Sequence, residues 1–89
     1  MTKYCYAETM AETCSKLSQT LNELGEDKLS RFYSAASDGF TYRKKLLTVK
    51  EANKPASREM INDFHDLKKF YEEKETLVKA NLDKEAKYQ

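Results

Sequence analysis

The side chains that could do chemistry in this sequence are one histidine, two cysteines and several pairs of neighbouring carboxylates. Cys5, Cys14 and His65 are the residue types of a nucleophilic thiol and its base. On the helix expected around it, however, His65 lies opposite Leu67 and Tyr71, among charged residues. The sequence therefore predicts a solvated surface histidine and no cysteine–histidine pair.

The two cysteines also indicate a compartment. Cys5 and Cys14 are separated by nine positions, which places them about 180° apart around a helix, so they cannot form a disulfide with each other. We expect Cys14 in the core and Cys5 partly exposed, both as free thiols. Free thiols fit a reducing compartment, and Lys3, Glu8 and Glu12 interrupt any secretory h-region, so a cytoplasmic location is predicted.

Neighbouring acidic residues such as Asp63 and Asp66 alternate with lysines at helical spacing, which is typical of an exposed, ion-paired helix face. The sequence has no Cys-x-x-Cys, His-Glu-x-x-His, glycine-rich phosphate loop or Gly-x-Ser-x-Gly pattern. We therefore expect no enzyme activity, no catalytic residue, no cofactor and no metal.

The composition predicts helices in a single domain spanning residues 1–89. Hydrophobic residues make up 39% and charged residues 35% of the chain, with only two glycines and one proline. The net charge is +1, so no global field would steer the protein to nucleic acid or to an anionic membrane. Binding of that kind would need a local patch.

Three helices are expected to position these side chains. Their approximate ranges are residues 3–24, 27–52 and 57–86. In the first, apolar residues recur every three or four positions from Tyr6 to Leu24. Thr2 is its expected N-cap, and Gly25 stands where a left-handed residue would end it.

The second helix raises the question of whether Gly39 breaks it. Its apolar stripe keeps one phase on both sides of Asp38 and Gly39, which predicts a continuous or kinked helix although Asp-Gly is a turn signal. Asp27 is the expected N-cap, and Pro55 ends the element. The stripe consists of Leu29, Phe32, Tyr33, Ala36, Phe40 and Leu47, with Arg43 in the same stripe and Gly39 at its edge.

The third helix, capped by Ser57, carries a broad apolar stripe from Met60 to Leu82 that Lys74 interrupts. Up-down-up packing of the three gives an antiparallel three-helix bundle. The alternative is an extended helix-turn-helix completed by dimerisation, so a homodimer is left open. The length of this helix predicts an overhanging end that presents Leu82 and Tyr88.

One segment departs from neutrality, because residues 43–58 hold six basic side chains and one acidic side chain, Glu51. Tyr42 lies off the apolar stripe and should be exposed beside Lys45, as a base-stacking or interface residue would be. Leu46, Val49 and Ile61 also fall off the stripes. The candidate partner-binding residues are Tyr42, Arg43, Lys44, Lys45, Leu46, Val49, Lys50, Lys54, Arg58 and Ile61.

These observations favour a small non-enzymatic protein-protein interaction module, an adaptor, regulator or inhibitor of a partner protein. The alternative is a nucleic-acid-associated regulator that uses the basic corner at residues 43–58. A membrane-surface binding helical domain is the third hypothesis. Membrane binding is less expected than binding to a protein or to nucleic acid.

Two segments resemble known families. The stretch "DKLSRFYSAASD", residues 27–38, resembles the D-x-L-x-x-F-Y-S-A-A segment of Hha-type bacterial nucleoid modulators. That resemblance implies a small helical protein that binds the nucleoid-structuring protein H-NS and alters gene silencing. The stretch "LKKFYEEKETLVKANLDKEAKYQ", residues 67–89, looks like the helices of BAR-type membrane-curving domains, which dimerise and carry basic tips.

Overall fold

The computed structural model describes the backbone of residues 1–87 and the side chains of residues 1–84. It confirms the predicted all-α class, since the described residues form helices and no strand longer than the isolated bridge between Thr2 and Pro55. None of these helices is both long and apolar enough to cross a bilayer. The helices are α1 (Lys3–Glu23), α2 (Asp27–Leu46), α3 (Val49–Ala52) and α4 (Arg58–Lys87).

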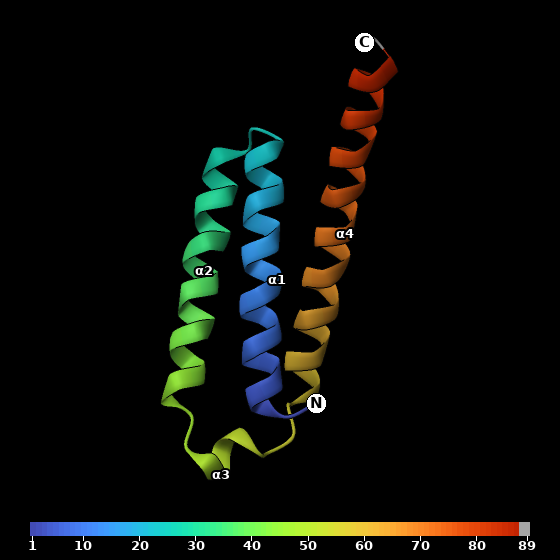
Figure 1. The fold of residues 1–89 in the computed structure, drawn as a ribbon. Coiled ribbons are helices and arrows are strands. Elements are labelled where there is room, and N and C mark those ends of the chain that lie inside the picture. The colour runs from blue at the N-terminus through green and yellow to red at the C-terminus, as the bar shows by residue number, and fades with distance from the viewer. Residues whose placement is uncertain (88–89) are drawn as a thin grey trace.

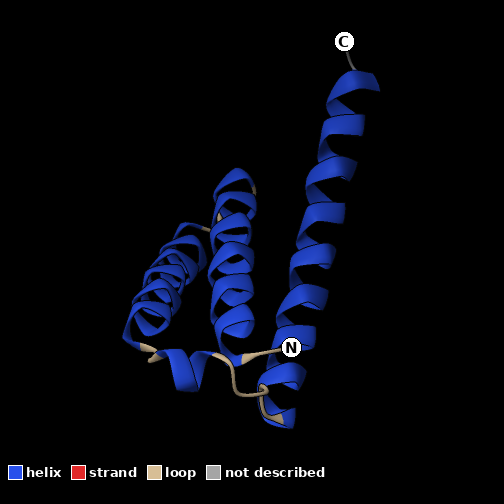
Figure 2. Ribbon diagram, turned by 60° about the horizontal axis from the view of Figure 1, so that its bottom comes forward, coloured by secondary structure: helices blue, strands red, loops and turns tan. Residues whose placement is uncertain are grey.

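The three long helices run up, down and up, with α1 between α2 and α4 (Figure 1). The short α3 and its flanking loops connect the lower ends of α2 and α4 (Figure 2). The N-terminus is fixed at the same end, because the Lys3 backbone N–H donates to the Lys54 carbonyl at 2.8 Å and the Ala56 N–H donates to the Met1 carbonyl at 2.8 Å. Towards its C-terminal end, α4 leans away from α1 and extends beyond it (Figure 1).

Three of the predicted caps are confirmed. The Thr2 hydroxyl accepts from the Cys5 backbone N–H at 3.1 Å, and the Ser57 hydroxyl accepts from the Met60 N–H at 3.2 Å. Gly25 has a φ of 77°, the left-handed conformation that ends a helix at low cost only for glycine.

The predicted start of the second helix at residue 27 is confirmed, but the predicted N-cap at Asp27 is wrong. Asp27 is already the first residue of α2, and Glu26 occupies the N-cap position without a side-chain hydrogen bond to the helix. The Glu26 carboxylate is engaged elsewhere, since it pairs with Lys74 of α4 at 3.1 Å. Glu26 therefore joins the beginning of α2 to α4.

The second helix is continuous across Gly39, as predicted, but it ends at Leu46 and does not reach residue 52. Leu47 is extended, with a ψ of 127°, and Thr48 caps the separate helix α3 by accepting from the Glu51 N–H at 3.2 Å. Threonine and valine are weak helix formers, and a threonine hydroxyl satisfies backbone N–H groups at a helix start. Thr48 and Val49 therefore favour a new start over continuation.

The core lies on α1. Tyr6, Met10, Cys14, Leu17 and Leu21 are buried, which confirms most of the predicted stripe, while Leu24 is half-buried. Thr20 and two small residues complete the buried set, namely Ala7 and Ala11.

The predicted stripe of α2 is wrong at its first turns, because Leu29 and Phe32 remain 40% and 62% exposed. Two serines of α2, Ser30 and Ser37, face α1 in their place. The Ser37 hydroxyl donates to the Ala11 carbonyl at 2.8 Å. Ser18 and Ser30 exchange hydroxyl-to-carbonyl hydrogen bonds at 2.7 and 2.8 Å. Such small side chains let two helices approach closely, and this approach turns the larger apolar residues to the flank.

The apolar stripe of α4 is half-buried, and Leu77 and Leu82 are exposed. It meets α2 through Tyr33 and Phe70, whose ring centroids are 6.0 Å apart. Lys74, the charge that interrupts the stripe, lies 5.4 Å from the Phe70 ring centroid. The predicted exposure of Tyr88 lies outside the described residues.

Candidate functional site

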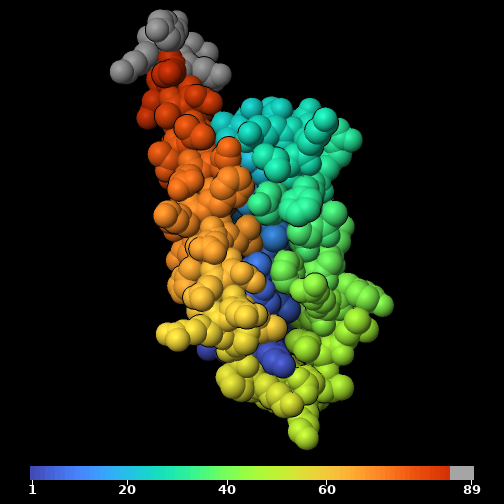
Figure 3. Space-filling model, turned by 180° about the vertical axis from the view of Figure 1, so that it is seen from behind, coloured from blue at the N-terminus to red at the C-terminus, as the bar shows by residue number. Residues whose placement is uncertain are grey.

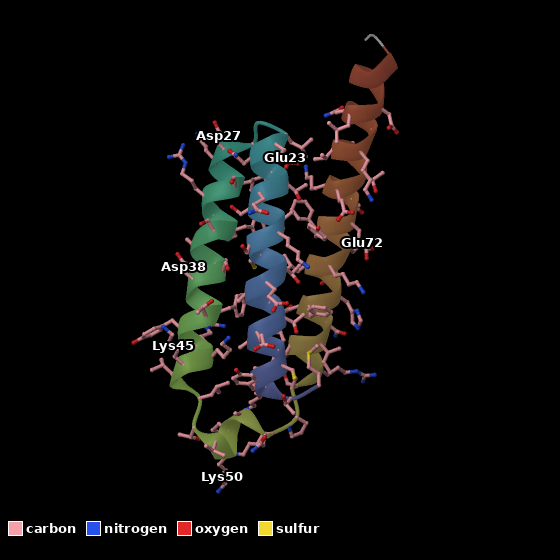
Figure 4. All side chains as sticks on the ribbon, viewed as in Figure 1. Glu23, Asp27, Asp38, Lys45, Lys50 and Glu72 are labelled. Carbon is pink, nitrogen blue, oxygen red and sulfur yellow. The ribbon has the colours of Figure 1, made fainter. Side chains whose placement is uncertain are left out.

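The predicted partner-binding residues lie at one end of the molecule, where α2 ends, α3 turns and α4 begins. From here on, the name basic corner covers residues 43–58 together with the neighbouring Tyr42, that is, residues 42–58. Figure 4 shows Lys45 on the last turns of α2 and Lys50 on α3, where Lys50 points away from the helices.

Exposed apolar side chains lie at this corner. Val49 on α3 is 81% exposed, the highest value among the large hydrophobic residues of the described chain. Tyr42 and Leu46 are 62% and 64% exposed, as predicted. Ile61 is half-buried, so its predicted exposure is wrong.

The cations of the corner fall into two groups. Lys44 pairs with Glu8 of α1 at 3.6 Å, and Lys54 pairs with Glu51 at 2.7 Å. The Arg43 guanidinium lies 5.2 Å from the Phe40 ring centroid. The second group is exposed and has neither an ion pair with a described carboxylate nor a cation–π contact with a described ring. It consists of Lys45, Lys50 and Arg58.

Glu51 is the only acidic residue of the corner, and its charge is already compensated. Its carboxylate accepts from Lys54 Nζ at 2.7 Å and from Lys3 Nζ at 3.3 Å. These two hydrogen bonds hold the pKa of Glu51 below its ordinary value. The outward field of the corner is therefore set by the free cations.

A cavity of about 260 Å³ opens beside the corner, between α1, α2 and the start of α4. Its wall is mainly apolar, with Lys3 and Arg43 at the edge. A smaller hollow of about 190 Å³ shares Phe40 and Arg43 with it and continues along α2 past Gly39 and Ala36. The apolar lining residues of the larger cavity are Tyr6, Ala7, Phe40, Leu46, Leu47 and Met60.

Figure 3 shows this face as a furrow, with α1 at the bottom between α2 and α4. The Tyr6 phenol lies there, and its pKa is raised by burial and then by the charge of Asp63 on α4, while Arg43 on α2 acts in the opposite direction. Arg43 of α2 and Asp63 of α4 thus lie near enough to act on this phenol with opposite sign. The sequence did not reveal this cavity, because its lining converges from the ends of three helices that are far apart along the chain.

The residues suited to chemistry are dispersed. His65 is exposed, as predicted, and lies beside Phe64 with 5.8 Å between the ring centroids. Cys5 is exposed and Cys14 is buried, also as predicted, and burial raises the pKa of the Cys14 thiol. Among residues 1–84, no three histidine, cysteine or acidic side chains gather into a group that would hold a metal ion. The most distinctive feature of the described residues is therefore the exposed apolar and basic surface of the corner.

Comparison with protein families, with curated proteins and with solved structures finds no match for this chain. The resemblances of residues 27–38 and 67–89 to Hha-type and BAR-type proteins therefore stay predictions.

Proposed function

We propose that this chain is a non-enzymatic protein-interaction module, an adaptor or regulator that binds a partner protein through the basic corner. The observation that carries the proposal is Val49, a valine 81% exposed on a short capped helix at the tip of the molecule. Burial of such a side chain in an interface contributes about 1.5–3 kcal/mol.

The side chains around Val49 support a partner of complementary chemistry. Leu46 extends the apolar patch, and Lys45, Lys50 and Arg58 provide cations without ion pairs to described carboxylates. An apolar centre with a charged rim is the usual anatomy of a protein interface, and complementary charge raises the rate of association. We infer an acidic partner surface with an apolar centre.

Affinity capture from a host-cell lysate tests this proposal. Tagged wild-type chain, Val49→Asp and Leu82→Asp are compared by quantitative mass spectrometry. Leu82 is 58% exposed on α4, far from the corner, so it is a matched control. We expect one protein in near-stoichiometric amount with wild type and Leu82→Asp, and at least a tenfold loss with Val49→Asp. Equal recovery by all three chains would refute a role for the corner.

A nucleic-acid-associated regulator is the second candidate, favoured by the same free cations and by Tyr42, 62% exposed beside them. Stacking on a base and contacts to phosphates would use these groups. This function predicts capture that disappears after nuclease treatment, and retention on DNA or RNA that falls steeply with salt. Flotation with anionic vesicles tests the third candidate, a membrane surface.

A further inference from the structure

The flank of α2 that carries Leu29 and Phe32, most of which the sequence assigned to the core, forms a regular surface. Its residues follow one another at steps of three and four, the spacing of a helix face that packs on another helix. Phe32 and Leu46 on this face keep 62% and 64% of their surface exposed, so α1 and α4 leave it largely uncovered. We call this face the α2 seam. It consists of Leu29, Phe32, Ala36, Gly39, Arg43 and Leu46.

The residue types of the α2 seam are arranged almost symmetrically about its middle. Its residues pair about a midpoint between Ser37 and Asp38: Leu29 with Leu46, Phe32 with Arg43, and Ala36 with Gly39. An antiparallel copy of the same helix would therefore place leucine against leucine, a phenylalanine ring against a guanidinium, and two small residues at the crossing. Each pairing is favourable, the second as a cation–π contact.

The seam also carries a projecting side chain and a matching cavity. Phe32 is the projecting side chain, and the 260 Å³ cavity lined by Phe40, Leu46 and Met60 opens next to Arg43. Because Phe32 and Arg43 are counterparts in the antiparallel pairing, the ring of one copy arrives at the cavity of the other. A two-fold interface requires this kind of self-complementary surface.

Gly39 permits the close approach. A Cβ atom built on Gly39 meets no heavy atom within 4 Å, so nothing in the described chain accounts for a glycine in the middle of this helix. Small residues at a helix crossing allow the two backbones to come near each other. Gly39 therefore leaves open space on the seam that a second helix could occupy.

We propose that two copies of this chain associate through their α2 seams in an antiparallel arrangement, with Ala36 and Gly39 at the crossing and Phe32 of each copy in the cavity of the other. This pairing does not rest on the proposed function. Arg43 and Leu46 belong to both surfaces, whereas Val49 and Lys50 lie on α3, outside the seam. The two basic corners point to opposite ends of the pair. Each dimer thus presents two corners to its partners.

The charge of α2 predicts a characteristic salt dependence for this dimerisation. Within residues 27–46 there are five basic and two acidic side chains, so two α2 helices repel each other at low salt. Screening by salt weakens that repulsion, so the dimer should strengthen as salt is added. Binding of an acidic partner or of nucleic acid at the corner should weaken under the same change.

Light scattering coupled to size exclusion tests the association at chain concentrations up to about 1 mM. The variants are Gly39→Leu, which fills the crossing without a clash inside the monomer, and Phe32→Asp, with Leu82→Asp as the control. Circular dichroism checks that each chain is folded.

We expect wild type and Leu82→Asp to rise from 10.4 kDa towards twice that mass, and Gly39→Leu and Phe32→Asp to stay at 10.4 kDa. A wild-type mass of 10.4 kDa at every concentration would overturn the proposal. Association of both seam variants at the wild-type concentration would overturn it as well. The capture experiment changes Val49 and Leu82, neither of which lies in the seam, so the failure of either proposal leaves the other standing.

A distance between two spin labels tests the orientation. Labels on Lys45→Cys in a Cys5→Ser background should lie about 20–25 Å apart in the antiparallel pair, from the helical rise of 1.5 Å per residue. A parallel pair would bring the labels to about 10 Å, the separation of packed helix axes, and would contradict the pairing of Phe32 with Arg43.

Discussion

At the scale of single residues, small hydroxyl side chains decide how the two best-packed helices meet. Ser37 donates to the Ala11 carbonyl of α1 at 2.8 Å, and Ser18 and Ser30 bind each other's carbonyls. These bonds satisfy polar groups inside a helix interface, where an unsatisfied group is costly. They explain why Phe32, though apolar, lies outside that interface.

Replacing one of these hydroxyls gives a direct measure of its contribution. Ser37→Ala should lower the free energy of unfolding by about 1 kcal/mol, because the hydrogen bond to Ala11 is lost in a partly buried place. Ser34→Ala, on the exposed face of the same helix, should change it by less than about 0.5 kcal/mol. Urea denaturation measures both. Equal effects would show that the Ser37 bond contributes nothing specific.

At the scale of elements, the two glycines have opposite roles. Gly25 ends α1 with a φ of 77°, where an L side chain is strained, whereas Gly39 has ordinary helical geometry and open space at its Cβ position. Gly39→Ala should therefore raise the free energy of unfolding by about 1 kcal/mol through helix propensity. Gly25→Ala should lower it by about 1–2 kcal/mol.

Thermal unfolding at low chain concentration, where self-association is minimal, checks this pair of glycine variants. A lower midpoint for Gly39→Ala would mean that the glycine is needed within the monomer. That result would remove one support of the seam.

The connection between α3 and the N-terminus should depend on pH through Glu51. Its pKa is lowered by hydrogen bonds from Lys54 and Lys3, so its contribution to stability is complete above the ordinary value of 4.5 and is lost as the pH falls through the lowered value. Carboxyl-carbon NMR should give Glu51 a midpoint below 4.5, and Lys54→Ala should shift that midpoint upward. A midpoint unchanged by Lys54→Ala would contradict this assignment.

Much of the helical architecture could be predicted from periodicity and capping residues. Thr2, Gly25 and Ser57 mark helix ends through local chemistry, and a local pattern is what a sequence displays. The end of α2 at Leu46 and the exposure of Phe32 were not predicted. Both depend on which face of α2 packs against α1, and periodicity alone does not determine that choice. The exposed Tyr42, Leu46 and Val49 were predicted because they fall off the stripes.

At the scale of the whole molecule, the chain is long and its core is narrow. The radius of gyration is 15.5 Å, against about 12 Å for a compact domain of this length. The extents are 55 × 21 × 17 Å, and the buried side chains among the described residues belong to the one helix that has neighbours on both sides. Such a shape leaves surface at its ends and along α2 open to contact.

We propose that this chain binds its partner through the basic corner. Hydrogen–deuterium exchange tests it most directly, with the chain measured alone and with a saturating amount of the protein captured from lysate. We predict slower exchange of the backbone amides in residues 42–58 on binding, with residues 77–84 of α4 unchanged. Protection confined to residues 77–84, with the corner exchanging as in the free chain, would contradict the claim.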